Sequence, residues 1–238
     1  MNRWQLCGSC ALIGIAWIVF YPTGAAGQLL VSDRVSNQIL EYNLDGSFRK
    51  ALVPPSFPTL YTPSGMVLGN GSDLFVANEN IGDNTYNVQR YNWRTGENLG
   101  GFDLGLNGPG GLLFDRASST LYVSDFGGHQ IVKYNTSTGD KTWLDAGAEV
   151  NGLADMALGQ DGNLYVSNFW DGTVLRFNPT AQTFTGAPTT YFSGANGLVF
   201  DSSGNLDLVG MFTNNVYQFD SSGAPIRELI PMAGGGLN

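Results

Sequence analysis

The chain has 238 residues, of which 42% are hydrophobic and 13% are charged, a composition that excludes a disordered protein. Its 20 acidic residues outnumber its 11 basic residues and give a net charge of −9, and the basic residues form no cluster, so binding to a nucleic-acid backbone is also excluded. The 33 glycines and 10 prolines favour many short strands joined by tight turns, with little helix.

Residues 1–27 are predicted to be a signal peptide. Arg3 supplies positive charge, residues 11–20 form an apolar stretch of ten residues, and residues 25–27 are small, as signal peptidase requires. The apolar stretch is too short for a membrane-spanning helix, although an uncleaved anchor is an open alternative. Both cysteines, Cys7 and Cys10, would leave with the signal. We therefore expect a secreted, periplasmic or cell-envelope protein with no disulfide, no thiol nucleophile and no stable membrane span.

From residue 28 onward the chain repeats a phrase of apolar residues that ends in Ser or Ala followed by Asp or Asn. The phrases are Leu29–Asp33, Leu74–Asn78, Leu121–Asp125, Leu164–Asn168 and, more loosely, Leu206–Gly210. Their first residues are 45, 47, 43 and 42 positions apart, which is the spacing of propeller blades of about 40–45 residues. The repeats are assigned to residues 28–61, 62–106, 107–150, 151–194 and 195–238.

Each repeat is predicted to form four antiparallel strands, so the fold class is an all-β propeller with about five blades encoded. The third repeat shows the pattern, with strands expected at residues 111–114, 121–124, 131–135 and 141–144. An aromatic residue recurs in the third strand of every repeat, and we expect these rings to pack between neighbouring blades. They are Tyr42, Tyr91, Tyr134, Phe177 and Phe219.

Three segments of the third repeat resemble the NHL repeat: Gly108–Phe114, Leu121–Asp125 and Gln130–Tyr134. Residues 28–238 as a whole are similar to the six-bladed, TolB-like propellers that include the gluconolactonases, and the predicted signal is similar to that of exported bacterial NHL-like proteins. The resemblance implies six blades. Because the first repeat begins at its second strand and the chain ends at a lead-in to another first strand, we expect an incomplete six-bladed propeller, with an open arc of five blades as the alternative.

Polar side chains are expected to collect on one face of the propeller, called here the top face, where the lead-in to each first strand lies beside the loop after the second strand. The lead-ins carry Asn107, Asn151 and Asn196. The Asp or Asn that ends each phrase could offer oxygen ligands to Ca²⁺ or Mg²⁺, but its recurrence favours a structural role in shaping the loop.

Asp155 is the sharpest candidate for a catalytic or ligand-binding residue, because it places a carboxylate on an inner strand where other repeats have glycine. Asn151 and Asn196 begin Asn-Gly-Leu segments, which resemble the segment that holds the divalent metal in gluconolactonase-like propellers. That resemblance implies a Ca²⁺ or Mg²⁺ site at Asn151, Asp155 and Asn196, although the acidic ligands of the family would lie in segments that this sequence lacks.

The second repeat has a longer connection, residues 79–87, which we expect to be a loop on the top face. Its Glu79 and Asp83 could bind a cation or only keep the loop solvated. The single histidine, His129, lies in a polar loop, and no Gly-x-Ser-x-Gly motif accompanies it, so a Ser-His-Asp triad is not expected.

The sequence therefore favours a non-enzymatic binding or scaffold module that presents its top face to a protein or glycan ligand. The alternative is a metal-dependent lactonase-type hydrolase, in which a cation in the channel polarises a lactone carbonyl and Asp155 assists the attack of water. No complete catalytic set is visible, and the question of an enzyme stays open at this point.

Overall fold

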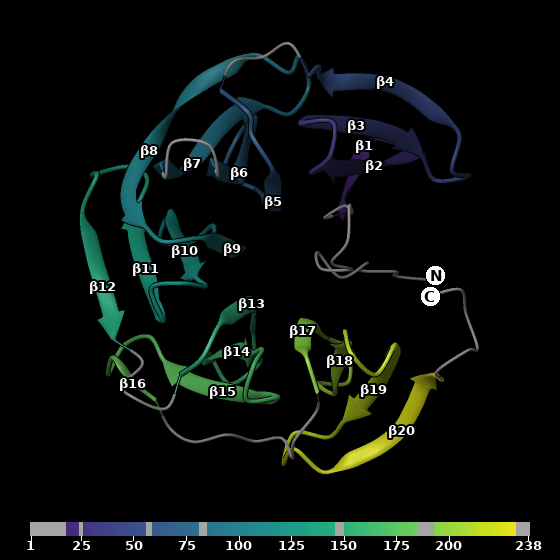
Figure 1. The fold of residues 1–238 in the computed structure, drawn as a ribbon, viewed down its shortest axis with the longest axis vertical. Helices are drawn as coiled ribbons and strands as arrows, with labels where there is room; N and C mark the ends of the chain where they lie inside the picture. The colour runs from purple at the N-terminus through teal and green to yellow at the C-terminus, as the bar shows by residue number, and fades with distance from the viewer. Residues whose placement is uncertain are drawn as a thin grey trace.

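The computed structural model of the protein describes residues 18–23, 26–55, 59–80, 85–145, 150–184 and 193–231. These residues form five four-stranded antiparallel sheets and no helix, arranged side by side around a central axis (Figure 1). The predicted fold class, a β-propeller of four-stranded antiparallel blades, is confirmed. The described sheets form an arc that has blade 1 (β1–β4) at one end and blade 5 (β17–β20) at the other (Figure 1).

The innermost strands line the centre of the arc. They are β1 (Ile18–Thr23), β5 (Pro63–Leu68), β9 (Pro109–Asp115), β13 (Leu153–Leu158) and β17 (Ala195–Phe200). The second strands are β2 (Ala26–Asp33), β6 (Asp73–Asn80), β10 (Thr120–Asp125), β14 (Leu164–Asn168) and β18 (Leu206–Gly210).

The third strands are β3 (Gln38–Asn43), β7 (Thr85–Asn92), β11 (Gln130–Asn135), β15 (Thr173–Asn178) and β19 (Asn215–Phe219). The outer strands are β4 (Phe48–Val53), β8 (Asn98–Leu106), β12 (Lys141–Asp145), β16 (Thr183–Phe184) and β20 (Pro225–Ile230). No helix within the described ranges offers the length and hydropathy needed to cross a membrane.

The hydrophobic core is divided into four clusters, and each cluster lies between two neighbouring blades. The cluster between blades 3 and 4, for example, combines Ile131 and Leu144 with Leu153, Val166 and Phe177. A four-stranded sheet cannot bury both of its faces alone, so packing against the next blade supplies most of the stability. The Leu and Val of the repeated phrase contribute to each of these clusters.

The aromatic ring of the third strand packs toward the preceding blade, as predicted. Tyr91, Phe177 and Phe219 are 0–2% exposed and belong to the clusters that join their blades to the preceding ones. Tyr134 is half-buried and stacks on Phe102 of blade 2 at a ring-centroid distance of 4.5 Å. Tyr42 has no preceding blade among the described sheets and instead contacts Phe48 of its own blade at 5.6 Å.

Serine hydroxyl groups of the first or second strand of a blade donate to carbonyl groups on the inner strand of the next blade. The buried Ser32 donates to the carbonyl oxygen of Ser64 at 3.0 Å, Ser64 donates to that of Pro109 at 2.9 Å, and Ser124 donates to that of Ala154 at 2.9 Å. These bonds cross from blade 1 to blade 2, from blade 2 to blade 3 and from blade 3 to blade 4. Each satisfies a buried hydroxyl group and fixes the offset between two blades.

The structure differs from the sequence analysis at two places in the first two blades. The first repeat was expected to begin at its second strand, but β1 pairs with β2 from Ile18↔Val31 to Thr23↔Ala26 and is the inner strand of blade 1. The long connection of the second repeat was expected to be a loop. Instead β6 and β7 continue into this connection and pair as a hairpin, with Glu79 opposite Tyr86 and Asn80 opposite Thr85.

Candidate binding site on the top face

The top face is formed where the loop after each second strand lies against the lead-in to the inner strand. Main-chain bonds hold the two together: Phe126 N donates to Gly108 O at 2.8 Å, Phe169 N donates to Gly152 O at 2.9 Å, and Met211 N donates to Gly194 O at 2.9 Å. The predicted position of the lead-ins and the loops on one face is therefore correct for blades 3–5. These bonds hold the loop backbones firmly in place.

In blades 2–4 the Asp or Asn that ends the phrase anchors the lead-in, which is the structural role that its recurrence favoured. Asn78, Asp125 and Asn168 each accept a hydrogen bond through Oδ1 from a main-chain N–H of the lead-in in the same blade. The donors are Tyr61 at 2.6 Å, Asn107 at 2.7 Å and Asn151 at 2.8 Å. Burial raises the pKa of Asp125, although the bonds that it accepts oppose this shift.

Four aromatic side chains from three successive loops meet on the top face and are called here the aromatic platform. Phe126 comes from blade 3, Phe169 and Trp170 come from blade 4, and Phe212 comes from blade 5. Phe169 lies at the centre of the platform, with ring centroids 5.8 Å from Phe126, 4.8 Å from Trp170 and 5.3 Å from Phe212. Phe169 is 2% exposed, whereas Trp170 is 54% exposed and Phe212 is 53% exposed.

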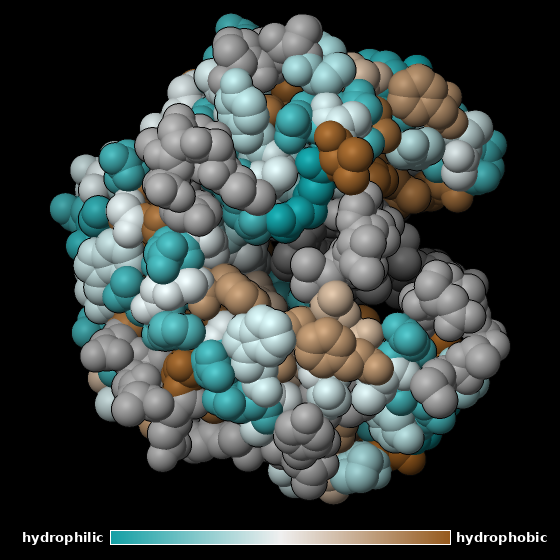
Figure 2. Space-filling view, in the orientation of Figure 1, coloured by the Kyte–Doolittle hydropathy of each residue, from teal (hydrophilic) through white to brown (hydrophobic). Residues whose placement is uncertain are grey.

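The two exposed rings of the platform form a shallow surface. Their centroids are 6.2 Å apart and their planes are inclined by 34°. Figure 2 shows tan and pale side chains beside the central opening, over the part of the arc that blades 4 and 5 form. A large apolar area that stays exposed on fixed loops is typical of a binding surface.

Glycine in the lead-ins allows the platform to sit close to the backbone. Gly152 has a φ of +80°, and a Cβ atom there would lie 2.8 Å from Trp170 Cδ1 and 3.0 Å from Phe126 Cζ. Its N–H group also lies 3.3 Å from His129 Nδ1, which accepts a hydrogen bond across the junction of blades 3 and 4. The platform is therefore positioned by backbone that has no room for a side chain.

The corresponding positions in blades 1 and 2 carry charge instead of aromatic rings. Arg34 follows Asp33 and Glu79 follows Asn78, just as Phe126 follows Asp125. The Arg34 guanidinium group donates to both carboxylate oxygens of Glu79, at 3.0 and 2.7 Å. Glu79 was a candidate cation ligand, but the structure commits it to an ion pair that joins blades 1 and 2. Asp83 lies outside the described residues.

The other predicted site residues are dispersed around the top face and the interior. Asn107 and Asn151 are exposed in the lead-ins of blades 3 and 4, beside Phe126 and Trp170. Asn196 is 7% exposed within β17, and Asp155 is 4% exposed within β13. Asn107 and Asn151 thus border the aromatic platform, whereas Asp155 and Asn196 belong to the interior of the inner strands.

Main-chain N–H groups donate to the Asp155 carboxylate. Its Oδ2 atom accepts a hydrogen bond from Leu198 N of the next blade at 3.3 Å. Burial raises its pKa to about 8 despite this bond and one from the amide of Met156. Without a bound cation, this carboxyl group is mostly protonated at neutral pH. Within the described part of the chain, moreover, no three His, Cys, Asp or Glu side chains converge.

The sequence analysis did not single out the platform residues, although a signal was present. An aromatic residue directly follows the phrase in the third and fourth repeats, and Phe212 lies two residues after it in the fifth. Each of these residues alone is unremarkable for a surface loop. Their convergence becomes visible only when the loops are placed side by side around the axis.

Comparison with known proteins finds no matching family model and no match among curated proteins. Solved structures do match. A streptogramin B lyase structure superposes with a TM-score of 0.69 at 16% identity, covering 93% of this chain and 71% of that one. A catalytically inactive virginiamycin B lyase from Staphylococcus aureus, with quinupristin, gives 0.68 at 14% identity, covering 93% and 73%. Nidogen in a nidogen–laminin complex gives 0.69 at 16% identity, covering 85% and 74%. At these identities the likeness shows the propeller fold alone.

Proposed function

We propose that the protein is a non-enzymatic binding propeller that holds a protein or glycan ligand on its top face, over blades 3–5. The observation that carries the proposal is the aromatic platform, in which Trp170 and Phe212 stay 54% and 53% exposed. Two large rings that stay in water do not contribute the free energy that their burial would give. A bound partner that covers them would recover that free energy.

The border of the platform favours a ligand that combines flat apolar faces with hydroxyl groups. The side chains of Asn107 and Asn151 are exposed beside Phe126 and Trp170, and their amide groups can both donate and accept hydrogen bonds. A sugar ring offers C–H groups on its faces and hydroxyl groups at its edge, and so matches this arrangement. A protein loop with an aromatic or proline residue would use the same rings.

Two similar structures were solved with a bound molecule or partner and support a binding role for the propeller by analogy. Nidogen was solved in a complex with laminin, and the virginiamycin B lyase was solved with quinupristin. We further propose that the protein works outside the cytoplasm, in the periplasm, in the cell envelope or as a secreted protein. This second proposal rests on the predicted signal peptide.

The test is a screen of immobilised glycans and of extracellular proteins with the full chain, followed by affinity measurement for the best ligand. Truncating a central interface aromatic residue typically costs 2 kcal/mol or more, so Trp170→Ala and Phe212→Ala should each weaken binding by about thirtyfold. Both rings lie on the surface, so thermal unfolding of the two variants should stay close to that of the parent chain.

The matched control is Glu79→Gln, which changes the corresponding loop position on the charged side of the top face. It should leave the affinity unchanged. Ligand binding that survives loss of both rings, or that depends on Glu79 instead, would contradict the proposal. Ca²⁺-stimulated lactone hydrolysis that Asp155→Ala abolishes would replace it with the hydrolase alternative.

A further inference from the structure

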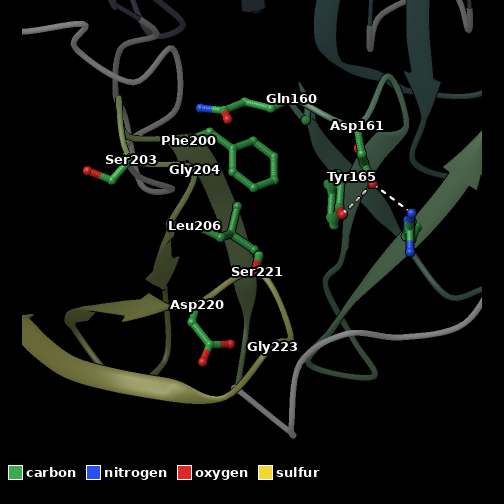
Figure 3. Close-up of a pocket in the computed structure, with 12 residues that line it drawn as sticks. Gln160, Asp161, Tyr165, Phe200, Ser203, Gly204, Leu206, Asp220, Ser221 and Gly223 are labelled. Carbon is green, nitrogen blue, oxygen red and sulfur yellow. Dashed lines mark hydrogen bonds and ion pairs between the residues drawn. The ribbon is translucent and has the colours of Figure 1, made fainter.

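A cavity of about 340 Å³ lies between blades 4 and 5, on the face that carries the turns joining first to second and third to fourth strands. Figure 3 shows Phe200 and Leu206 along its middle, Gln160 and Ser203 at one end and Asp220 at the other. Tyr165 and Asp161 form the wall contributed by blade 4 (Figure 3). The cavity belongs to neither the aromatic platform nor the top face, since its walls come from the opposite turns.

The junction of blades 2 and 3 has the same framework but is bridged by a side chain of the protein. Arg116, in the turn after β9, donates through one guanidinium nitrogen to Gly69 O and through the other to Leu68 O at 3.2 Å. Phe75 and Phe114 pack beneath it with ring centroids 5.4 Å apart. A guanidinium group therefore bridges blades 2 and 3 at this junction by donating to two main-chain carbonyl groups.

The same elements recur between blades 4 and 5. Tyr165 and Phe200 take the places of Phe75 and Phe114, with centroids 4.8 Å apart. Leu158 pairs with Leu164 as Leu68 pairs with Leu74, so Leu158 and Gly159 correspond to the two residues whose carbonyl groups accept from Arg116.

The residue that corresponds to Arg116 is Ser202. Phe114 pairs with Leu121 and Phe200 pairs with Leu206, and Arg116 and Ser202 each follow those phenylalanines by two residues. A serine side chain is too short to reach the preceding blade. The position of the Arg116 guanidinium group between blades 2 and 3 thus corresponds to the cavity between blades 4 and 5.

The charges on the cavity wall suit a cation. Arg176 is already paired with Asp161 at 2.7 Å. Burial pushes the pKa of Asp161 up, but hydrogen bonds from Asn163 and Tyr165 and the charge of Arg176 outweigh it and lower the pKa. Hydrogen bonds from Ser222 and Ala224 lower the pKa of Asp220. Both carboxylates are therefore ionised at neutral pH, and the wall has more negative than positive charge.

We propose that this cavity binds a guanidinium group, such as that of an arginine side chain, in the position that Arg116 occupies between blades 2 and 3. The guanidinium group would donate to the main-chain carbonyl group of Gly159, which lines the cavity, and its alkyl stem would lie along Phe200 and Leu206. Asp220 at the open end would add electrostatic attraction.

The test uses two probes of the same shape, L-arginine amide and L-citrulline amide, in which a neutral urea group replaces the guanidinium group. Each is titrated into the full chain while the amide NMR signals of Ser203, Gly204 and Gly223 are followed. Arginine amide should shift these signals in a saturable way, and citrulline amide should bind at least about tenfold more weakly, since charge-assisted bonds are the stronger ones.

Two substitutions locate the site. Ser202→Arg should fill the cavity from within and abolish binding of arginine amide. Asp220→Asn should weaken binding by about threefold, the size expected of an exposed ion pair. The matched control is Asp45→Asn in blade 1, where the carboxylate also accepts from the amide and hydroxyl groups of the serine two residues later, at 2.9 and 2.6 Å.

Equal binding of the two probes would overturn the proposal, as would binding that Ser202→Arg leaves intact. If Ser202→Arg does not fold, the comparison of probes and the pair Asp220→Asn and Asp45→Asn still decide the question. Absence of any saturable shift with arginine amide would also overturn it. The top-face proposal is unaffected by each of these outcomes, because it concerns other residues.

Discussion

Asp155 lies on the inner strand of blade 4, and its side chain contacts the inner strands of blades 3 and 5. A Cβ atom on Gly111 of β9 would come within 2.6 Å of its Oδ1 atom, and its Oδ2 atom accepts from Leu198 N of β17. At the preceding junctions a serine of a second strand, Ser32 or Ser124, donates to a carbonyl group on the inner strand of the next blade. Asp155 stands where β5, β9 and β17 carry glycine, and it adds a carboxyl link at the junction of blades 4 and 5.

This environment makes stability depend on pH. The pKa of Asp155 is raised to about 8 in the folded chain from 3.8 in the unfolded chain. Between these values the unfolded state releases a proton that the folded state keeps, so the free energy of unfolding falls by about 1.4 kcal/mol per pH unit. The loss of unfolding free energy due to Asp155 is absent below about pH 4 and complete above about pH 8.

Asp155→Asn should remove this dependence, because an amide does not ionise but can still accept from Leu198. The variant should gain stability relative to the parent chain as the pH rises from 5 to 8, as measured by urea unfolding at several pH values. All other titrating groups are common to both chains and cancel in the difference. Parallel curves for the two proteins would show that Asp155 is not the group responsible.

Asn168 gives a second prediction at the residue scale. Asn168 is 1% exposed and accepts from Asn151 N, so Asn168→Ala leaves a part-buried N–H without its acceptor. The expected loss is about 1–3 kcal/mol of unfolding free energy. Asn151→Ala is the control, because its own side chain is exposed and it keeps the N–H group, and it should cost less than about 0.5 kcal/mol. Similar losses in the two variants would refute the anchoring role of Asn168.

At the scale of elements, the inner strands approach one another so closely that glycine is required between them. A Cβ atom on Gly65 of β5 would lie 2.3 Å from Gly110 O of β9, a main-chain atom that cannot turn aside. Gly65→Ala should therefore force β5 and β9 apart and cost about 3 kcal/mol, at the upper end of overpacking effects.

The control for this variant is Gly162→Ala in a surface turn. Gly162 has a φ of +76° but no atom within 4 Å of an added Cβ, so only the backbone preference of alanine is at stake, about 1 kcal/mol. Urea unfolding of both variants measures the difference. If Gly65→Ala cost no more than the control, the spacing of the inner strands would be adjustable, contrary to the contact seen here.

The elements were the part of the structure that the sequence predicted best. Three features recur at fixed spacing: the Leu and Val of the phrases, the aromatic side chain of the third strand and the turn glycines. This recurrence reveals each blade even when the arrangement of the blades around the axis is unknown. The platform was missed for the opposite reason, since Phe126, Trp170 and Phe212 come from three blades and meet only through the curvature of the arc. The ion pair of Glu79 with Arg34 could not be predicted, because Arg34 lies 45 residues away in another blade.

At the scale of the whole molecule, one segment of sequence has two competing interpretations. Residues 18–20 end the apolar stretch of the predicted signal peptide, and the structure places the same residues in β1 (Ile18–Thr23). An apolar run of this length fits either an inner strand or a signal sequence, and periodicity does not separate the two. Cleavage near Gln28 would remove the whole of β1 from blade 1.

The last prediction compares a chain that starts at Ile18 with one that starts at Gln28. Since β1 pairs with β2 over six residues, its removal leaves the N–H and C=O groups on one edge of β2 unpaired. The shorter chain should melt roughly 5–10 °C lower, the shift expected for a loss of about 2–3 kcal/mol in a domain of this size. Mass spectrometry of the protein exported from cells then shows which start the mature chain has. Equal melting temperatures would mean that β1 adds nothing to blade 1, and the signal-peptide interpretation would account for these residues alone.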